Sequence, residues 1–578
     1  MADNQRPVIY QLLPRLFSNT CPTPVPSAPI TINGSGKLNG ITAETIRYIK
    51  SLGCNHIWLT GVLEHSHDAD YTRYGIARHN PHVIKGLAGS PYAITDYYDI
   101  DPDLAEDVPH RLEEFDACVK RIHDAGMKVV IDFVPNHVAR EYHSDSAPAG
   151  IEDFGKGDNQ DMFFSPQNNF YYIPRQKFSP EADMGSGPDA YIEFPARATG
   201  NDCYTAFPGV CDWYDTVKLN YGVDPSNGWG HFDPVPPTWF KMLNILRYWA
   251  ARGVDAFRCD MVHMVPVAFW HWAISGVKKD YPDVLFIAEI YDVALYRPYI
   301  FDGGFDYLYD KVTLYDTLRA IETGNVSAAC LTSCWQTVEG IGGHMLNFLE
   351  NHDEQRFASV QYAGDAARVL PSLVVSATIG TGAMMIYFGQ EIGEPGADAE
   401  GYSGHDGRTT IFDYWSIEKV RRLYDGGTCG GPLSKEERIL LEQYRTVLNL
   451  INREDALRDG AFFDLMYVNY DNPHFNPHRQ YAFLRKGRDA TLLIAVNFDD
   501  RNVDLKINVP AHAFDVLGIS PRECRCTELL SGRRSTIVFS DERPASFALE
   551  AHGAAIWRIP HARAKKASQP RAVSAEND

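Results

Sequence analysis

The chain has 578 residues, of which 44% are hydrophobic and 22% charged, a composition typical of folded proteins and long enough for two or three domains. Its formal net charge of −21 disfavours binding to nucleic-acid phosphates or to anionic membrane surfaces. No apolar run approaches the roughly 20 residues that span a bilayer. The first residues lack the architecture of a cleavable signal peptide, so we expect a cytoplasmic protein or an exported one whose leader is absent from this chain.

Strands and helices alternate along most of the chain. Apolar runs predict eight strands, at residues 8–15, 56–62, 128–134, 254–260, 284–290, 305–311, 345–351 and 383–392. Eight strands alternating with helices predict an α/β fold of the (β/α)8 TIM-barrel type. An open doubly wound sheet is the alternative, but no glycine-rich phosphate-binding motif supports a nucleotide-binding version of it.

Two further segments depart from this alternation. Residues 138–235 are rich in glycine, proline, asparagine and aromatic residues, so we expect an inserted loop-rich domain after the third strand. Short alternating patterns predict a C-terminal antiparallel β-sandwich, with strands at 466–470, 480–486, 491–498, 503–509, 535–540 and 554–560. The predicted domains are a barrel of residues 1–137 and 236–455, the insertion at 138–235, the sandwich at 456–560 and a disordered tail at 561–578.

The eleven cysteines are an odd number, so at least one thiol is unpaired, and none has the spacing of a zinc site. Reduced thiols in a cytoplasm are the simplest interpretation. In an exported protein, Cys203 could pair with Cys211, and Cys330 with Cys334.

Four segments end a buried apolar run with polar side chains, the position where barrel enzymes carry their chemistry. In chain order they are KVVIDFVPNH, GVDAFRCD, VLFIAEIYD and FLENHDEQR. Together they supply Asp132, Asn136, His137, Arg258, Asp260, Glu289, His352 and Asp353. Because the carboxyl ends of parallel strands meet at one rim of a barrel, we expect these side chains to converge on one cavity.

Two of these acids are predicted to have opposed protonation states. Arg258 and Asp260 are two residues apart and hence on one face of a strand, so the guanidinium should keep this carboxylate ionised, as a nucleophile requires. Glu289 ends an apolar run, where loss of hydration raises a carboxyl pKa and retains the proton of a general acid. Two such carboxyls about 5 Å apart are typical of retaining glycoside hydrolysis.

The remaining residues fit the same cavity. Asp353 could grip sugar hydroxyls and strain the ring, His137 could bind another hydroxyl, and Asp132 could orient the arginine. Singly, each has a structural alternative as a cap, a satisfied core histidine or an ion-pair partner. Their joint occurrence in this order favours a catalytic site.

The four segments resemble the four ordered sequence regions of the alpha-amylase family, glycoside hydrolase family 13. The resemblance includes SPYAITDYYDIDPDL at residues 90–104 and YFGQEIG at 387–393, and it covers residues 7–455. It implies that Asp260 is the nucleophile, Glu289 the general acid/base and Asp353 the stabiliser of the transition state. It also implies substrate-binding roles for Tyr92, His137, Arg258 and His352.

The activity implied is hydrolysis of α-1,4-glucosidic bonds in starch-like polysaccharides or maltooligosaccharides, by double displacement. TVKLN at residues 216–220 resembles a region of neopullulanases and cyclomaltodextrinases. A transglycosylase or an isomerase acting on maltooligosaccharides, sucrose or trehalose would use the same acids and is the alternative. A non-catalytic carbohydrate-binding homologue is a further alternative. Endo or exo action, tolerance of α-1,6 bonds and oligomeric state are left open.

No cofactor is required for this chemistry, and a structural calcium is left open. Asn136 could supply an oxygen ligand to such an ion. His263 and Met264 stand where many family members have Lys-His, a departure that puts the usual calcium-linked backbone in doubt. The loop NGSGKLNG at residues 33–40 lacks the closely spaced acids of a calcium loop.

Overall fold

The computed structural model describes residues 5–402 and 404–561. The chain divides into two compact units between Arg453 and Glu454. The predicted tail at 561–578 lies, except for its first residue, outside the described residues. None of the helices within the described ranges is long and apolar enough to cross a membrane.

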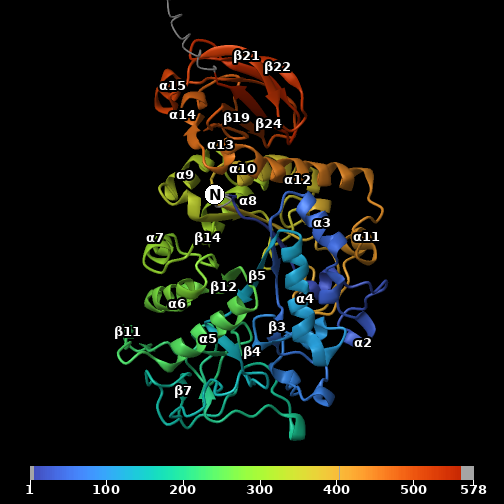
Figure 1. The fold of residues 1–578 in the computed structure, drawn as a ribbon, viewed down its shortest axis with the longest axis vertical. Helices are drawn as coiled ribbons and strands as arrows, with labels where there is room; N and C mark the ends of the chain where they lie inside the picture. Colours follow the sequence, from blue (N-terminus) through green and yellow to red (C-terminus); the bar gives the residue numbers. More distant parts are fainter. Residues whose placement is uncertain (1–4, 403, 562–578) are drawn as a thin grey trace, which may run out of the picture. The chain divides into compact units, whose positions relative to one another are not determined.

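The first unit contains a closed barrel of eight parallel strands, which confirms the predicted fold class (Figure 1). Around the barrel the order is β1-β16-β15-β14-β13-β12-β5-β2. The strands are β1 (Val8–Leu12), β2 (His56–Leu59), β5 (Lys128–Phe133), β12 (Ala256–Cys259), β13 (Leu285–Ala288), β14 (Tyr307–Tyr309), β15 (Met345–Phe348) and β16 (Ala383–Tyr387). Most of their residues are buried, as expected of strands covered by side chains on one face and helices on the other.

Helices lie between successive strands. In chain order the longer ones are α3 (Ala43–Ser51), α4 (Arg111–Asp124), α5 (Pro237–Ala251), α6 (Val267–Asp280), α7 (Val293–Phe301), α8 (Asp316–Glu322), α9 (Leu331–Thr337), α10 (Leu370–Thr378), α11 (Glu418–Tyr424) and α12 (Lys435–Arg453). In α12, leucines recur at the spacing of an amphipathic helix and are buried, whereas α10 is buried on nearly all sides. Thr42 begins α3 by accepting a hydrogen bond from the backbone N–H of Thr45.

The register between neighbouring strands decides which polar side chains share the interior. Arg258 on β12 pairs with Asp132 on β5 and with Ile287 on β13. Since side chains alternate between the two faces of a strand, Arg258 and Asp132 both point into the barrel, and Cys259 faces outward. The arginine therefore lies next to the strand ends that carry the predicted acids.

Short antiparallel pairs build the walls above this rim. After β2 the chain forms β3 (Leu63–His65), which pairs with β4 (Ile94–Ile100). The inserted segment after β5 contains β6 (His137–Ala139) paired with β9 (Thr216–Lys218), β7 (Tyr172–Ile173) with β8 (Ala196–Arg197), and β10 (Val223–Asp224) with β11 (Trp229–Gly230). Its Phe178 and Tyr191 pack edge to face in a small apolar core, to which Val83 from the loop between β3 and β4 also contributes.

The second unit is a sandwich of a six-stranded and a two-stranded antiparallel sheet. The larger sheet has the order β17 (Ala461–Asp464), β18 (Gln480–Lys486), β19 (Ala490–Asn497), β24 (Ala554–Pro560), β21 (Arg522–Glu528) and β22 (Arg534–Phe539), and the smaller one pairs β20 (Val503–Ile507) with β23 (Ala545–Leu549). The predicted strand at 466–470 was wrong. Residues Met466–Asn469 form the short helix α14 instead. Met466 and Asn469 are both buried, and their i, i+3 spacing places them on one face of a helix.

Candidate active site

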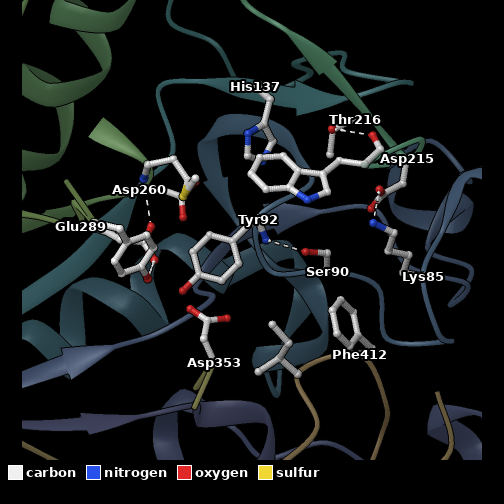
Figure 2. Close-up of a pocket in the computed structure, with 14 residues that line it drawn as sticks. Lys85, Ser90, Tyr92, His137, Asp215, Thr216, Asp260, Glu289, Asp353 and Phe412 are labelled. Carbon is white, nitrogen blue, oxygen red and sulfur yellow. Dashed lines mark hydrogen bonds and ion pairs between the residues drawn. The ribbon is translucent and has the colours of Figure 1, made fainter. Parts of the chain in front are cut away.

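A cavity of about 370 Å³ opens at the carboxyl ends of the barrel strands. Its lining includes the predicted residues Tyr92, His137, Asp260, Glu289 and Asp353. In Figure 2, Asp260 and Glu289 lie on one side of the Tyr92 ring, and the Lys85 and Asp215 side chains lie on the other. The sequence segments that supply these residues are far apart, so closure of the barrel is what brings them together.

Arg258 joins the two strand-end acids. Its Nη1 lies 2.8 Å from Oδ1 of Asp260, and its Nη2 lies 2.8 Å from Oε1 of Glu289. The guanidinium is fully buried and also contacts the Tyr309 hydroxyl at 3.2 Å through Nε. Asp132 is 3.7 Å away, and it is held by the indole N–H of Trp58 at 3.1 Å. One arginine thus fixes the orientation of both carboxyls.

The prediction that Arg258 simply keeps Asp260 ionised is corrected by this geometry. Burial raises the pKa of Asp260 well above its usual range, the negative charge of Glu289 raises it further, and Arg258 acts in the opposite direction. The sequence argument assigned the arginine to Asp260 alone, whereas it is shared. Asp260 therefore retains its proton to higher pH than an ordinary aspartate.

Backbone geometry positions Glu289 from the opposite side. The N–H of Met261 donates to Oε2 of Glu289 at 2.9 Å, and the Tyr291 hydroxyl donates to Oε1 at 2.5 Å. Met261 adopts a φ of 42°, a left-handed conformation that is strained for a side chain of this kind. The strain lies directly after Asp260, where it turns the backbone N–H towards the second acid.

Asp353 lines the same cavity as Asp260 and Glu289 and contacts His352, which in turn contacts Tyr92. The Asp353 Oδ2 lies 3.0 Å from Nε2 of His352, and the Tyr92 hydroxyl lies 2.6 Å from the same nitrogen. Gln11 donates to Nδ1 at 2.8 Å, so Nε2 carries the ring proton. Burial acts to raise the pKa of Asp353, but the attraction and hydrogen bond of His352, aided by Arg258, outweigh it and lower the pKa to about 2.

The far end of the cavity is formed by loops. The His137 ring packs against Trp213 with ring centroids 5.2 Å apart, and burial lowers the pKa of this histidine to about 3, which keeps it neutral. Lys85 and Asp215 form an ion pair of 2.9 Å at the cavity wall. Phe412 completes this end with an aromatic face. Aromatic faces beside charged hydrogen-bonding groups suit the mixed polarity of a sugar.

Asn136 does not fit a calcium ion. Its Oδ1 accepts a hydrogen bond from the ammonium group of Lys218, which is 5% exposed. The same Nζ donates to the Met264 carbonyl at 3.1 Å and lies 2.6 Å from Asp202. A positively charged side chain therefore occupies the centre of the oxygen cage, and a divalent cation placed there would be repelled.

Replacing Lys218 by methionine is expected to destabilise the first unit by about 1–3 kcal/mol, because the buried Asn136 oxygen and the Met264 carbonyl would lose their shared donor. The measurement is the free energy of unfolding from chemical denaturation. Lys156→Met is the matched control, since Lys156 pairs with Glu152 on the surface at 3.2 Å with 67% of its side chain exposed. Equal stability of the two variants would contradict a role for Lys218 in holding the insertion.

A scan against protein-family models matches the description "Alpha amylase, catalytic domain" at residues 11–189 and 236–423, more than half of the chain. The chain belongs to the alpha-amylase family. It is 28% identical over 360 residues to the alpha-amylase MalA of Haloarcula japonica, covering 61% of this chain but only 41% of that relative. It is 22% identical to a cyclomaltodextrinase of Thermoanaerobacter pseudethanolicus over 88% of this chain and 73% of that one.

Solved structures of the family share the fold. A maltogenic alpha-amylase of Thermotoga neapolitana aligns over 97% of this chain and all of its own, with a TM-score of 0.62 at 19% identity. Membership of an enzyme family of glycoside hydrolases and the eight-stranded barrel agree with the expectations from the four sequence segments.

Some residues of the site were not predicted. Tyr291 follows Glu289 by two residues, and this spacing was a usable signal because it places both on one side of an extended chain. Lys85, Trp213 and Asp215 come from long loops without periodicity, and nothing in their local sequence indicates that they line the cavity. All eleven cysteines are free thiols, so neither candidate disulfide is formed.

Proposed function

We propose that the protein is a retaining glycoside hydrolase that cleaves α-1,4-glucosidic bonds in starch-like polysaccharides or maltooligosaccharides. The observation that carries this proposal is the Asp260 and Glu289 pair joined by Arg258, with Asp353 lining the same cavity. The names of the amylase and cyclomaltodextrinase relatives support an α-glucan as the substrate class.

In this mechanism the glycosidic bond breaks in two steps. Glu289 donates its proton to the leaving oxygen while Asp260 attacks the anomeric carbon, giving a covalent glycosyl ester and a free sugar. Glu289 then takes a proton from water, whose oxygen attacks the same carbon and releases Asp260. The chemistry needs one proton in the site, and the raised pKa of Asp260, caused by burial and by the charge of Glu289, favours retaining a proton there before the sugar binds.

The surrounding residues have binding roles in this proposal. Asp353 is 42% exposed at the side chain and carries a low pKa, so it stays ionised and accepts hydrogen bonds from sugar hydroxyls. His352 holds the Asp353 carboxylate in place through the 3.0 Å contact of its Nε2 with Oδ2. Tyr92 offers a buried aromatic ring, stacked on His352 at 5.2 Å, for the face of the reacting sugar. Neutral His137 donates or accepts one further hydroxyl bond.

Incubation with maltoheptaose, starch, pullulan and cyclodextrin, followed by chromatography of the products, tests the proposal. Shorter oligosaccharides with initial α-configuration by NMR support retaining hydrolysis. Products longer than the substrate would favour the transglycosylase. Rearranged disaccharides formed from maltose or sucrose would favour an isomerase, and unchanged sugars would favour a binding protein.

Replacing Arg258 by glutamine is expected to shift the acid limb of kcat/KM to higher pH by about one unit or more. The guanidinium lowers the pKa of Asp260, so its loss raises that pKa. The nucleophile works only when ionised, and activity is therefore lost at a higher pH as the solution is acidified. The pH profile on maltotriose measures the shift.

Arg485→Gln is the matched control for this pH shift. Arg485 is also buried but belongs to the second unit, so its replacement should leave the acid limb in place. An unchanged acid limb in Arg258→Gln would exclude this role for the guanidinium.

A further inference from the structure

A second group of buried polar residues lies at His67, Asp101 and Asp103. One ring nitrogen of His67 and one carboxylate oxygen of each aspartate lie within 4.8 Å of one another, and all three residues are buried. His67 follows strand β3, and the aspartates follow β4. None of them lines the cavity that contains Asp260 and Glu289. The group is therefore separate from the candidate active site.

The imidazole of His67 has no polar partner of its own. The residue is 1% exposed, and neither Nδ1 nor Nε2 forms a hydrogen bond with any described residue. Its ring contacts are edge-on, with Tyr71 at 5.6 Å and His79 at 5.8 Å between centroids. Leaving a buried polar atom without a partner is unfavourable, so a buried ring with two such nitrogens indicates a missing ligand.

The two carboxylates are oriented by neutral donors. Tyr71 and Tyr414 donate their hydroxyls to the two oxygens of Asp103 at 2.8 and 2.7 Å. The backbone N–H of Asp103 donates to Oδ1 of Asp101 at 2.9 Å. Within the described chain, no lysine or arginine nitrogen forms an ion pair with either carboxylate. Each oxygen retains a lone pair for a further ligand.

His65 leaves the second oxygen of Asp101 incompletely satisfied. Arg15 contacts Nε2 of His65 at 3.1 Å as a donor, so the ring proton of His65 is on Nδ1. That nitrogen lies 2.9 Å from both the Leu63 carbonyl and Oδ2 of Asp101, and one N–H serves two acceptors. The result is a fixed carboxylate with capacity for a cation, supported by a second layer of hydrogen bonds of the kind seen around metal ligands.

We propose that His67, Asp101 and Asp103 bind a divalent cation of the zinc class. One imidazole with two carboxylates suits Zn²⁺ better than Ca²⁺, which takes oxygen ligands throughout. The ligands flank the loop of residues 68–93, which carries Lys85 and Tyr92 into the active-site cavity. The ion would fasten both ends of this loop and take no part in bond cleavage.

The test uses the full chain, stripped of metal by dialysis against a chelator. Zn²⁺ is then titrated in competition with a chromophoric chelator, and the melting temperature is followed with and without the ion. We expect one equivalent bound at this site and a higher melting temperature in its presence. His67→Ala is expected to weaken Zn²⁺ binding by about tenfold or more.

His79→Ala is the matched control, because it removes a buried ring in contact with His67 but leaves the three ligands in place. Its affinity for Zn²⁺ should stay within about threefold of the parent, a difference of about 0.7 kcal/mol. Asp103→Asn provides a second ligand variant if His67→Ala does not fold, and it too is expected to weaken Zn²⁺ binding by about tenfold or more. Absence of a bound equivalent in the parent protein, tighter binding of Ca²⁺ than of Zn²⁺, or equal losses in the two histidine variants would overturn the proposal.

Discussion

Asp260→Asn is expected to reduce kcat on maltooligosaccharides by about 10⁴-fold or more, because an amide cannot form the glycosyl ester on which the proposed double displacement depends. The replacement keeps the side-chain volume and the acceptor for Arg258 Nη1. Steady-state rates on maltoheptaose, with the product analysed by chromatography, measure the loss. A residual rate within about tenfold of the parent would reject Asp260 as the nucleophile.

The same variant should fold at least as well as the parent. The pKa of Asp260 is higher in the folded than in the unfolded protein. The free energy of unfolding therefore falls as the pH rises from the unfolded pKa to the folded one, because the folded state must then hold a buried negative charge. An uncharged asparagine removes this loss near neutral pH. Asp310→Asn is the matched control. Asp310 is buried, burial raises its pKa to about 7, and it caps the turn at Lys311–Tyr315 without lining the cavity. Its variant should keep most of the activity.

Glu289→Gln is expected to lower kcat on starch by about 10²- to 10⁴-fold while sparing the first step for sugars with good leaving groups. A nitrophenolate leaves without protonation, so a nitrophenyl maltoside should show a rapid burst of nitrophenol followed by slow turnover. Added azide attacks the glycosyl ester without a general base and should restore the second step. The burst and the azide product are both measurable by absorbance and mass spectrometry.

Two outcomes would contradict the acid/base role of Glu289. An equal loss on starch and on the nitrophenyl maltoside would indicate damage to the site as a whole, and so would the absence of any azide product. Glu391→Gln is the matched control, because Glu391 is fully buried and accepts hydrogen bonds from Tyr10 and Tyr48 outside the cavity. Its amide retains an oxygen for both hydroxyls, and activity should be nearly unchanged.

The barrel was predictable because its strands are buried on both faces and therefore stand out as short apolar runs. The second unit was less so. Strands β21 (Arg522–Glu528) and β23 (Ala545–Leu549) alternate charged or small residues with a few apolar ones, and their pairing depends on distant strands. The segment at 466–470 has the alternation of a strand, but a buried asparagine and methionine fix it as a helical turn.

The same distinction holds for the site. Acids at strand ends were predictable, since a buried strand determines where its last side chain points. The sharing of Arg258 between two carboxyls was not predictable, because it depends on how the neighbouring strands β12 and β13 pair in the closed barrel. The contact between the Lys218 ammonium and Asn136 was not predictable either, because 82 residues separate them in sequence. The segment TVKLN, which contains Lys218, was noted only for its resemblance to a family region.

At Asn136, the positive charge is supplied by the Lys218 side chain, so this contact needs no metal ion. Chelators, phosphate or dilution can remove a bound metal ion from a protein. The charge of a lysine side chain is covalently attached and cannot be removed in this way. At this point the inserted segment is therefore joined to the residues after β5 by a positive charge that the chain itself supplies.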